Sequence, residues 1–310
     1  MNRTCADLAL AAVTVIWGTT FVVVKSALVD ISPFLFLTLR FCLAALVLGA
    51  ICRHAFSGAR FRIRRLWPGL LAGGLLFAAY VFQTLGLQLT TPSQSAFLTG
   101  LSIPMVPLAS SLVYRDRPRF REVAGILIAS FGMVLMTLPS VSSGFGMGRG
   151  DFLSLLCAVT FALHIVVIGH YSRVIGFEPL AVVQLGTAAA LSLLAVWFAE
   201  PVRFHATPAV AGAVLLTGLL ATALAFTTQA WAQQYTSASR AALIFALEPV
   251  VAWATSWLLT GETLAGRGMA GAGLILSGIL LVELKRTKPE EHQKKRGRLF
   301  GIIQSKRGTY

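Results

Sequence analysis

A single acid inside an apolar stretch is the first feature of this sequence that could do chemistry. Segment 237–262 is long and apolar enough to cross a bilayer, yet it carries the pair Glu248-Pro249 near its middle. A carboxylate in hydrocarbon is costly, so an intramembrane acid indicates a functional site or a specific partner. Glu248 is therefore predicted either to carry protons or bind a substrate amine, or to be a structural carboxylate bonded to a neighbouring helix.

Prolines within apolar segments predict kinks at Pro104, Pro107 and Pro249. Proline lacks an N–H and clashes with the carbonyl four residues earlier, which is Phe245 in the case of Pro249. The freed carbonyls are tolerated in a membrane only where they face protein or a water-filled cavity. Each kink is predicted to act as a hinge or line a pathway, or to be a static bend that helps packing.

Three basic residues lie within apolar segments. Arg40 is the eighth residue of segment 33–53, which places it on the order of 10 Å below the membrane edge at the rise of a helix. Arg40 should face the protein interior and bind a substrate carboxylate, pair with an acid or cap freed carbonyls. Lys25 and Arg240 lie nearer the ends of their segments, so they are predicted to reach the surface as anchors.

Amide and aromatic side chains supply a second set of polar groups. Tyr80 and Gln83 share one helical face, and Gln229 and Gln233 share another. Unpaired amides in hydrocarbon are costly, so these faces should turn inward. The predicted cavity residues are Trp17, Arg40, Tyr80, Gln83, Gln88, Gln94, Gln229, Trp231, Gln233 and Glu248. Such a lining suits a small zwitterionic or weakly polar metabolite better than a polyphosphate.

The elements that must position these residues are transmembrane helices. The chain has 310 residues, of which 56% are hydrophobic and 12% charged, with a mean hydropathy of +0.76. Apolar runs near the ~20 residues that span a bilayer recur along the chain. We predict an all-α membrane protein with ten spans, the first being a retained span and not a cleaved signal peptide. The spans are 7–27, 33–53, 67–88, 92–114, 120–139, 151–171, 178–199, 209–230, 237–259 and 267–285.

The net charge of +14 is distributed as an orientation signal, not as a nucleic-acid surface. If the N-terminus is cytoplasmic, 20 of the 26 Lys and Arg residues lie in cytoplasmic segments, three in outer loops and three within spans. The positive-inside rule then predicts a multi-pass protein of a cell inner membrane with both termini cytoplasmic. The basic tail, 286–310, is expected to be disordered or to lie on the anionic inner leaflet.

The two halves of the chain resemble each other at a separation of about 145 residues. The matched pairs include Asp7 with Asp151, Gln88 with Gln233, Ala96 with Ala241, Pro104 with Pro249 and, after a one-residue gap, Gly125 with Gly271. We expect repeats at 1–139 and 140–285, each with five spans. Five is odd, so the second repeat enters the membrane from the opposite side, a transporter signature with a site near the midplane.

Several motifs are similar to those of the drug/metabolite transporter superfamily, specifically its ten-helix EamA type. They are Trp17-Gly18 with Phe21, Leu39-Arg40-Phe41, Pro104, Arg115-Asp116-Arg117-Pro118, Leu247-Glu248-Pro249 and Thr260-Gly261-Glu262. The resemblance covers residues 7–285. It implies an exporter in which spans 1–4 and 6–9 surround a central cavity while spans 5 and 10 lie at the periphery. The second repeat departs from it at Phe161-Ala162, which predicts less flexibility there.

Nothing in the sequence indicates an enzyme, a metal site or a cofactor. His164 and His170 are six residues apart and do not share a helical face. The four cysteines form no CxxC pair and are expected to be small buried hydrophobes. A membrane enzyme would need catalytic groups clustered at one interface, whereas the intramembrane charges here are few and scattered.

The sequence therefore predicts an exporter of a small metabolite, such as an amino acid or a related compound, that works by alternating access. Its partners would be that metabolite, membrane lipids and, at Glu248, protons. A flippase for a lipid-linked headgroup is the alternative, and it requires a cavity open sideways with a basic pocket. A channel would need a continuous pore. A small-residue stripe at Gly125, Ala129 and Gly132 fits intramolecular packing or a weak dimer, so the chain is expected to be a monomer or weak dimer.

Overall fold

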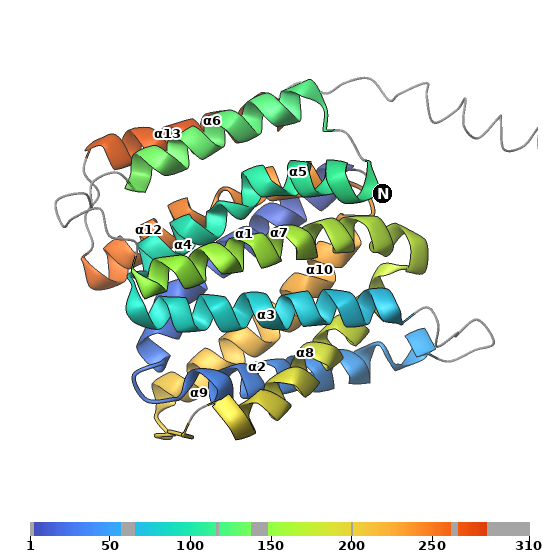
Figure 1. Ribbon diagram of the computed structural model, residues 1–310, viewed down its shortest axis with the longest axis vertical. Coiled ribbons are helices and arrows are strands. Elements are labelled where there is room, and N and C mark those ends of the chain that lie inside the picture. Colours follow the sequence, from blue (N-terminus) through green and yellow to red (C-terminus); the bar gives the residue numbers. More distant parts are fainter. Residues whose placement is uncertain are drawn as a thin grey trace, which may run out of the picture.

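The computed structural model describes residues 3–56, 66–115, 118–137, 148–199, 201–261 and 266–283. Helices make up the regular structure of these residues, apart from one isolated bridge between Ile31 and Phe204. Their axes run side by side across the molecule (Figure 1). The tail predicted to be disordered, 286–310, lies outside the described residues.

Seven of the predicted spans are single helices and three are interrupted. The single helices are α1 (Arg3–Ala27), α2 (Pro33–Ile51), α3 (Trp67–Leu89), α6 (Phe120–Thr137), α7 (Arg149–Ile175), α8 (Phe177–Ala199) and α13 (Gly266–Glu283). The interrupted spans are α4 (Pro92–Gly100) with α5 (Ser102–Tyr114), α9 (Pro208–Leu215) with the π-helical segment η4 (Leu216–Leu224) and α10 (Ala225–Ala232), and α11 (Ala238–Phe245) with α12 (Glu248–Thr260). A short 3₁₀ turn, η1 (Arg53–Phe56), follows α2.

Eight of these ten spans are long and apolar enough to cross a membrane, judged by length and composition. The other two, α6 and α13, have 18 residues each. The prediction of an all-α membrane protein with ten spans is therefore confirmed for the described residues. Large apolar side chains such as Leu112, Phe120 and Phe198 point outward and are more than four-fifths exposed, as a lipid-facing surface requires.

The fourth and ninth spans break at equivalent positions. At Leu101 the backbone N–H bonds the carbonyl of Leu98 (3.2 Å), and at Ala246 it bonds that of Leu243 (3.1 Å). Both bonds reach back three residues instead of the four of an α-helix. In each span a proline follows three residues later, and its missing N–H removes a bond of the regular ladder. The helix is therefore interrupted at the same place in both repeats, just before Pro104 and Pro249. Pro107 does not interrupt its helix and lies inside α5.

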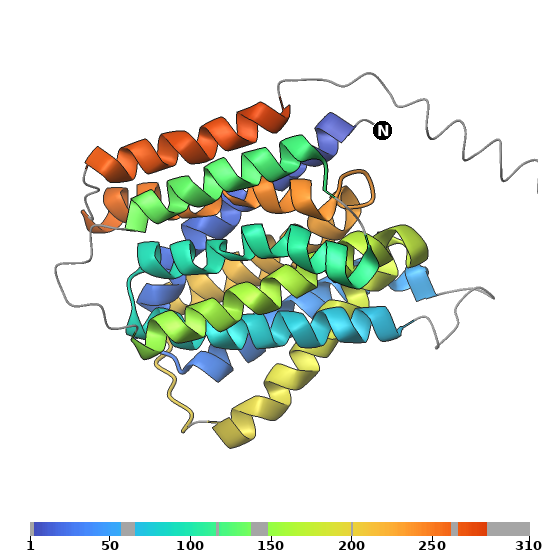
Figure 2. The same cartoon turned by 45° about the horizontal axis from the view of Figure 1, so that its top comes forward.

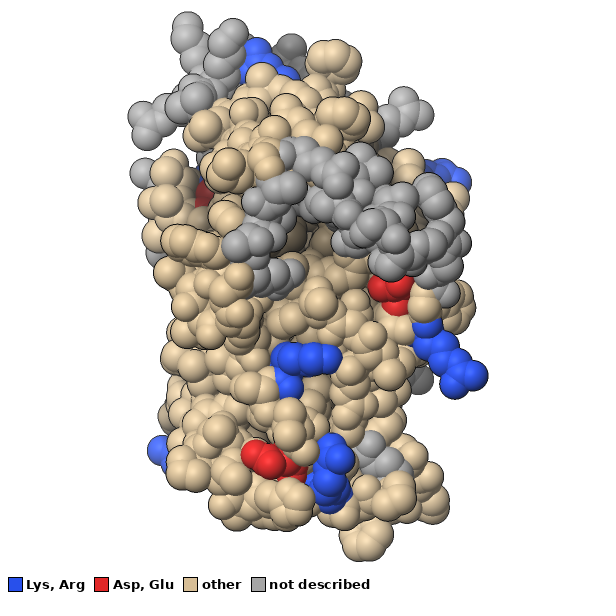
Figure 3. Space-filling view, turned by 90° about the vertical axis from the view of Figure 1, so that its left-hand side faces the viewer, with Lys and Arg blue, Asp and Glu red and all other residues tan. Residues whose placement is uncertain are grey.

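The two repeats pack as an inverted pair. Helix α3 lies along α7 in the same way that α1 lies along α10, while α2 packs on α8 and the broken span α4–α5 on α11–α12. Helix α1 starts at the end of the bundle that carries the N label, and α7 starts at the other end (Figure 1). We call these the N-terminal end and the opposite end. Figure 3 looks onto the opposite end, where charged side chains are few.

Helices α6 and α13 form a separate layer at the edge of the bundle (Figure 2). Their backbones come so close that a Cβ on Gly125 would lie 2.7 Å from the Gly278 carbonyl oxygen, and one on Gly278 would lie 2.5 Å from the Gly125 carbonyl oxygen. Within this chain the small-residue stripe is thus used for intramolecular packing. Glycine has the same use in α1, where a Cβ on Gly18 would lie 2.6 Å from Cβ of Val251 in α12.

The cysteines are less buried than the sequence suggested. Cys157 is buried, Cys42 and Cys52 are half-buried, and Cys5 is exposed near the start of α1. The expectation of small buried hydrophobes is therefore right for Cys157 and wrong for Cys5, because the first turn of α1 extends past the packed part of the bundle.

Candidate functional site

A cavity lies at the centre of the bundle, between the two repeats. Residues from α1, α2, α3, α4 and α5 line one part of it, and residues from α7, α10, α11 and α12 line the rest. Six of the ten predicted cavity residues are in this lining: Trp17, Arg40, Tyr80, Gln83, Gln229 and Glu248. Residues more than 200 positions apart in the sequence thus meet around one space.

Aromatic rings form much of the cavity wall. The Trp17 ring lies 5.2 Å from Phe226 and 5.2 Å from Phe245, measured between centroids. The Tyr80 ring meets Phe161 edge to face at 5.5 Å. Tilted and edge-to-face packing at these separations is the favourable geometry for aromatic side chains. The wall is therefore rigid and apolar around a small number of polar groups.

Arg40 is the buried cation of the cavity and is 2% exposed. Its Nε donates to Oγ1 of Thr222 (2.6 Å), its Nη2 donates to the Tyr80 hydroxyl (2.9 Å), and its guanidinium carbon lies 4.2 Å from the Tyr80 ring centroid. Among the described residues no carboxylate lies within ion-pair distance of Arg40. Neutral acceptors and an aromatic face orient the guanidinium, and its positive charge has no counterion within the described part of the chain.

The π-helical segment η4 supplies one of these acceptors. The carbonyl of Ala221 accepts a hydrogen bond from Nε1 of Trp17 (2.9 Å) and a longer one from Nη2 of Arg40 (3.4 Å). A π-turn interrupts the regular α-helical ladder and recurs at functional sites. In this chain it ties α1 and α2 of the first repeat to the eighth span of the second repeat, beside the cavity.

Glu248 is the first residue of α12 and lies in the cavity lining. The positive end of the α12 dipole favours a negative charge at this position. Among the described residues no side chain donates a hydrogen bond to its carboxylate or forms an ion pair with it. The break at Ala246–Leu247 thus presents an acid to the cavity from the start of a half-helix.

The other four predicted residues lie outside the lining. Gln233 is fully buried and donates to the carbonyl of Ile165 in α7 (3.1 Å), and Gln229 donates to its side-chain oxygen (3.3 Å). The Trp231 ring packs 5.6 Å from Tyr235. Gln88 and Gln94 are half-buried at the opposite end, near the turn that joins α3 to α4. These side chains connect helices or cover the ends of the bundle.

The cavity also contains residues that the sequence analysis did not select. His164 is fully buried in α7, with Nε2 2.9 Å from Oε1 of Gln184, and its Nδ1 has no hydrogen-bond partner. His164 was considered only as a metal ligand, and the described residues contain no cluster of three possible ligands. The repeat could have indicated these residues. Phe161 follows Asp151 by ten residues, as Trp17 follows Asp7, and His164 follows Asp151 by thirteen residues, as Thr20 follows Asp7. All four of these side chains line the cavity.

Lys25 and Arg240 are not the surface anchors that the sequence suggested. Nζ of Lys25 donates to the carbonyls of Leu87 (2.7 Å), Gln88 (2.9 Å) and Thr90 (3.0 Å) at the end of α3. Helix C-termini leave such carbonyls without partners, and a cation satisfies both their hydrogen bonding and the helix dipole. Arg240 is buried and bonded to Asp7. The prediction was wrong for Arg240, which is buried, and both side chains bond partners within the protein.

Comparisons with known proteins agree with this architecture. Residues 4–138 and 148–284 each match the EamA-like transporter family. The chain is 38% identical over 266 residues to an uncharacterized transporter of Archaeoglobus fulgidus. The alignment covers 85% of this chain and 81% of that protein. It is 23% identical over 266 residues to the uncharacterized transporter YoaV of Bacillus subtilis, covering 82% of this chain and 88% of that one. A crystal structure with 24% identity superposes with a TM-score of 0.73 over 91% of this chain and 98% of that chain, which shows the shared fold.

Two inverted sets of helices that enclose a cavity at half depth define a class of membrane protein, the multi-pass transporters. Within that class the chain belongs to the EamA-like transporter family, which matches both of its halves. The resemblance seen in the motifs is thereby confirmed at the level of the family.

Proposed function

We propose that this transporter moves a small zwitterionic metabolite, such as an amino acid or a related compound, across the membrane by alternating access. One observation carries the proposal. The central cavity holds both a buried guanidinium, that of Arg40, and a carboxylate, that of Glu248, and neither has an oppositely charged partner among the residues that the structure describes. A molecule that carries an anion and a cation complements both.

The chemistry of the lining supports this substrate class. A guanidinium presents a planar fork of donors that matches a carboxylate, and desolvation strengthens such a pair. A substrate ammonium would find acceptors in Glu248 and in Oε1 of Gln229, which is buried and accepts no hydrogen bond from the residues that the structure describes. The aromatic wall around Trp17 offers apolar surface and cation–π contact. A lipid-linked phosphate headgroup is less suited, because Arg40 is the only cationic side chain among the lining residues.

The course of the cavity supports alternating access. Its lining continues along the later turns of α1 and α3, through Val24 and Leu87, toward the opposite end of the bundle. Toward the N-terminal end, α1 carries buried apolar side chains such as Leu10 and Val13, which are packed in the protein core. A carrier that alternates exposes the site to one side at a time, and inverted repeats allow the two states to be related by symmetry. We further propose an inner-membrane location, export as the direction and cytoplasmic termini.

Exchange of labelled substrate in proteoliposomes tests the proposed substrate class. Vesicles loaded with a panel of amino acids and amines are mixed with trace labelled amino acid, and uptake by counterflow is measured. Arg40→Gln should reduce exchange of zwitterions at least tenfold, because the buried carboxylate site loses its charge. The control Arg149→Gln removes an exposed arginine at the start of α7 and should leave exchange unchanged. Equal exchange by native protein and Arg40→Gln would rule out the carboxylate site.

A further inference from the structure

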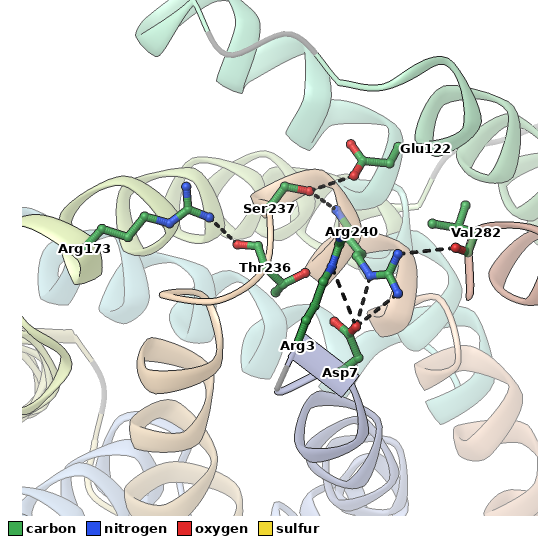
Figure 4. A network of polar contacts seen from close by, with 8 residues as sticks. All are labelled: Arg3, Asp7, Glu122, Arg173, Thr236, Ser237, Arg240 and Val282. Carbon is green, nitrogen blue, oxygen red and sulfur yellow. Dashed lines mark hydrogen bonds and ion pairs between the residues drawn. The ribbon is translucent and has the colours of Figure 1, made fainter. Parts of the chain in front are cut away.

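A charged network closes the N-terminal end of the bundle (Figure 4). Nη2 and Nε of Arg240, in α11, donate to Oδ2 of Asp7 in α1 at 3.0 and 3.2 Å, and Nη1 donates to the carbonyl of Val282 in α13 (3.3 Å). The side chains of the pair are only 6% and 10% exposed, so the ion pair is buried. The hydroxyl of Ser237 donates to Oε1 of Glu122 in α6 (3.0 Å).

We propose that Asp7, Glu122, Ser237 and Arg240 form a gate, the N-terminal gate, which seals this end of the cavity and must separate when the carrier exposes its site to the other side. The inference rests on the alternating-access mechanism proposed above. Both bonded pairs join one repeat to the other, since Asp7 and Glu122 belong to the first and Ser237 and Arg240 to the second. Separation of the repeats at this end therefore has to break both contacts.

The ion pair of the gate lies on the same two spans as cavity residues, the first and the ninth. Asp7 precedes Trp17 by ten residues on α1, and Arg240 precedes Glu248 by eight residues. Buried side chains, Leu10 and Val13 on α1 and Leu243 on α11, lie between the two levels. The break at Ala246–Leu247 separates α11, which carries Arg240, from α12, which carries Glu248. A change of angle at this break would move the gate cation relative to the cavity acid.

The inverted repeat provides an internal comparison, because the same positions recur at the opposite end. Asp7 corresponds to Asp151, but Arg240 corresponds to Ser95, which carries no charge. Oδ2 of Asp151 accepts a hydrogen bond from the N–H of Gly148 at the start of its own helix (3.1 Å), so it caps α7. The hydroxyl of Ser95 is buried without a hydrogen-bond partner. Among the described residues, a buried Asp–Arg pair between the repeats is thus a feature of one end, the end toward which the cavity does not extend. The contact between the repeats at the opposite end, from Nδ1 of His205 to Oδ1 of Asp30 (3.8 Å), joins side chains that are 68% and 33% exposed.

Labelling of a single cysteine tests the gate without any substrate. The reporter is Ser102→Cys, a near-isosteric change in the cavity lining, in a chain whose native cysteines are replaced by serine. A membrane-impermeant maleimide is applied in vesicles from the face that carries the N-terminus, and the labelling rate is measured. Asp7→Asn and Arg240→Gln should each raise the rate about tenfold, because loss of the pair shifts the population toward the state open at this end. Asp151→Asn is the matched control and should label at the native rate.

The double variant Asp7→Asn/Arg240→Gln completes a thermodynamic cycle. If the two residues act as one pair, the double variant should be labelled at the same rate as a single variant, because the first substitution already removes the ion pair. The double variant leaves no unpaired buried charge, so it reports on the gate even where a single variant folds poorly.

Three results would overturn the gate: a native rate in the double variant, single effects that multiply in the double variant, or an equal rise in Asp151→Asn. Because the assay uses no substrate, its outcome is separate from that of the exchange experiment. Faster labelling of the variants without zwitterion exchange would support the gate and contradict the proposed substrate. Zwitterion exchange with unchanged labelling would support the substrate and contradict the gate.

Discussion

At the scale of single residues, the cavity differs from an ordinary protein interior in how its charges are partnered. Buried ionic groups are normally paired, because an unpaired one bears its desolvation cost alone. Asp7 and Arg240 follow that rule at the N-terminal end. Among the described residues, Arg40 and Glu248 do not pair with an opposite charge. Two groups without an opposite charge in one cavity are consistent with the zwitterionic substrate proposed above.

Glu248 gives the first prediction at this scale. If this carboxyl carries the proton that drives transport, Glu248→Gln should lose the dependence of transport on a pH gradient. Some substrate exchange should remain, because the amide keeps the size and the acceptor of the acid, but it should be slower than in the native protein, because the substrate ammonium loses its counterion. Uptake into proteoliposomes with and without an imposed gradient measures this. Glu178→Gln, an exposed acid in the first turn of α8, serves as the control. Gradient dependence that survives in Glu248→Gln would show that the proton is carried elsewhere or not at all.

At the scale of secondary-structure elements, close contacts between helix backbones determine how the helices pack. Helices α6 and α13 approach through glycines, so that the backbones at Gly125 and Gly278 come into direct contact. In a membrane, close backbone contact replaces the hydrophobic effect as the source of helix association. The contact stabilises the peripheral layer, which in turn lies over α11, the helix of Arg240.

Gly278→Ala tests this contact. The new Cβ would lie 2.5 Å from the carbonyl oxygen of Gly125, so α6 and α13 must move apart. We expect a loss of about 1–3 kcal/mol, the usual cost of overpacking, seen as a lower melting temperature in detergent. Gly273→Ala on the same helix meets nothing within 4 Å and should be neutral or slightly stabilising, because alanine favours helix. Equal melting temperatures for the two variants would refute the close contact.

Sequence alone was sufficient for the spans, because the membrane fixes the length of an apolar run and proline fixes where a helix can break. It also selected Arg40 and Glu248, since depth along a span is countable. It could not pair Asp7 with Arg240, which are 233 residues apart, because opposite charges combine according to the tertiary arrangement. The π-helical segment at Ala221 was missed for a related reason, since its backbone hydrogen bonding has no residue signature.

At the scale of the whole molecule, two five-helix repeats of opposite sense share one cavity. The N-terminus, the turn after α2 and the end of α13 all lie at the same end of the bundle (Figure 1). The basic residues concentrate in the segments that follow these points, which supports a cytoplasmic location for this end.

Sidedness is testable with introduced cysteines in intact cells. Arg62→Cys and Lys294→Cys should react with an impermeant maleimide only after the membrane is opened, because both positions are expected to be cytoplasmic. His205→Cys, in the connection between α8 and α9 with a side chain 68% exposed, should react in intact cells. Labelling of Arg62→Cys and Lys294→Cys from different faces would contradict the even number of spans.

Two basic side chains have a further mechanical consequence. Lys25 joins the end of α1 to the end of α3, and Arg173 of α7 donates to the carbonyls of Gln233 and Thr236 after α10. Each brace lies inside one repeat and fastens its first span to its third. Sliding one repeat across the other leaves both braces intact, whereas bending a repeat internally would break hydrogen bonds between a cation and the backbone carbonyls at a helix end. If the carrier alternates between two states as proposed, the two braces predict that each repeat moves as a unit against the other.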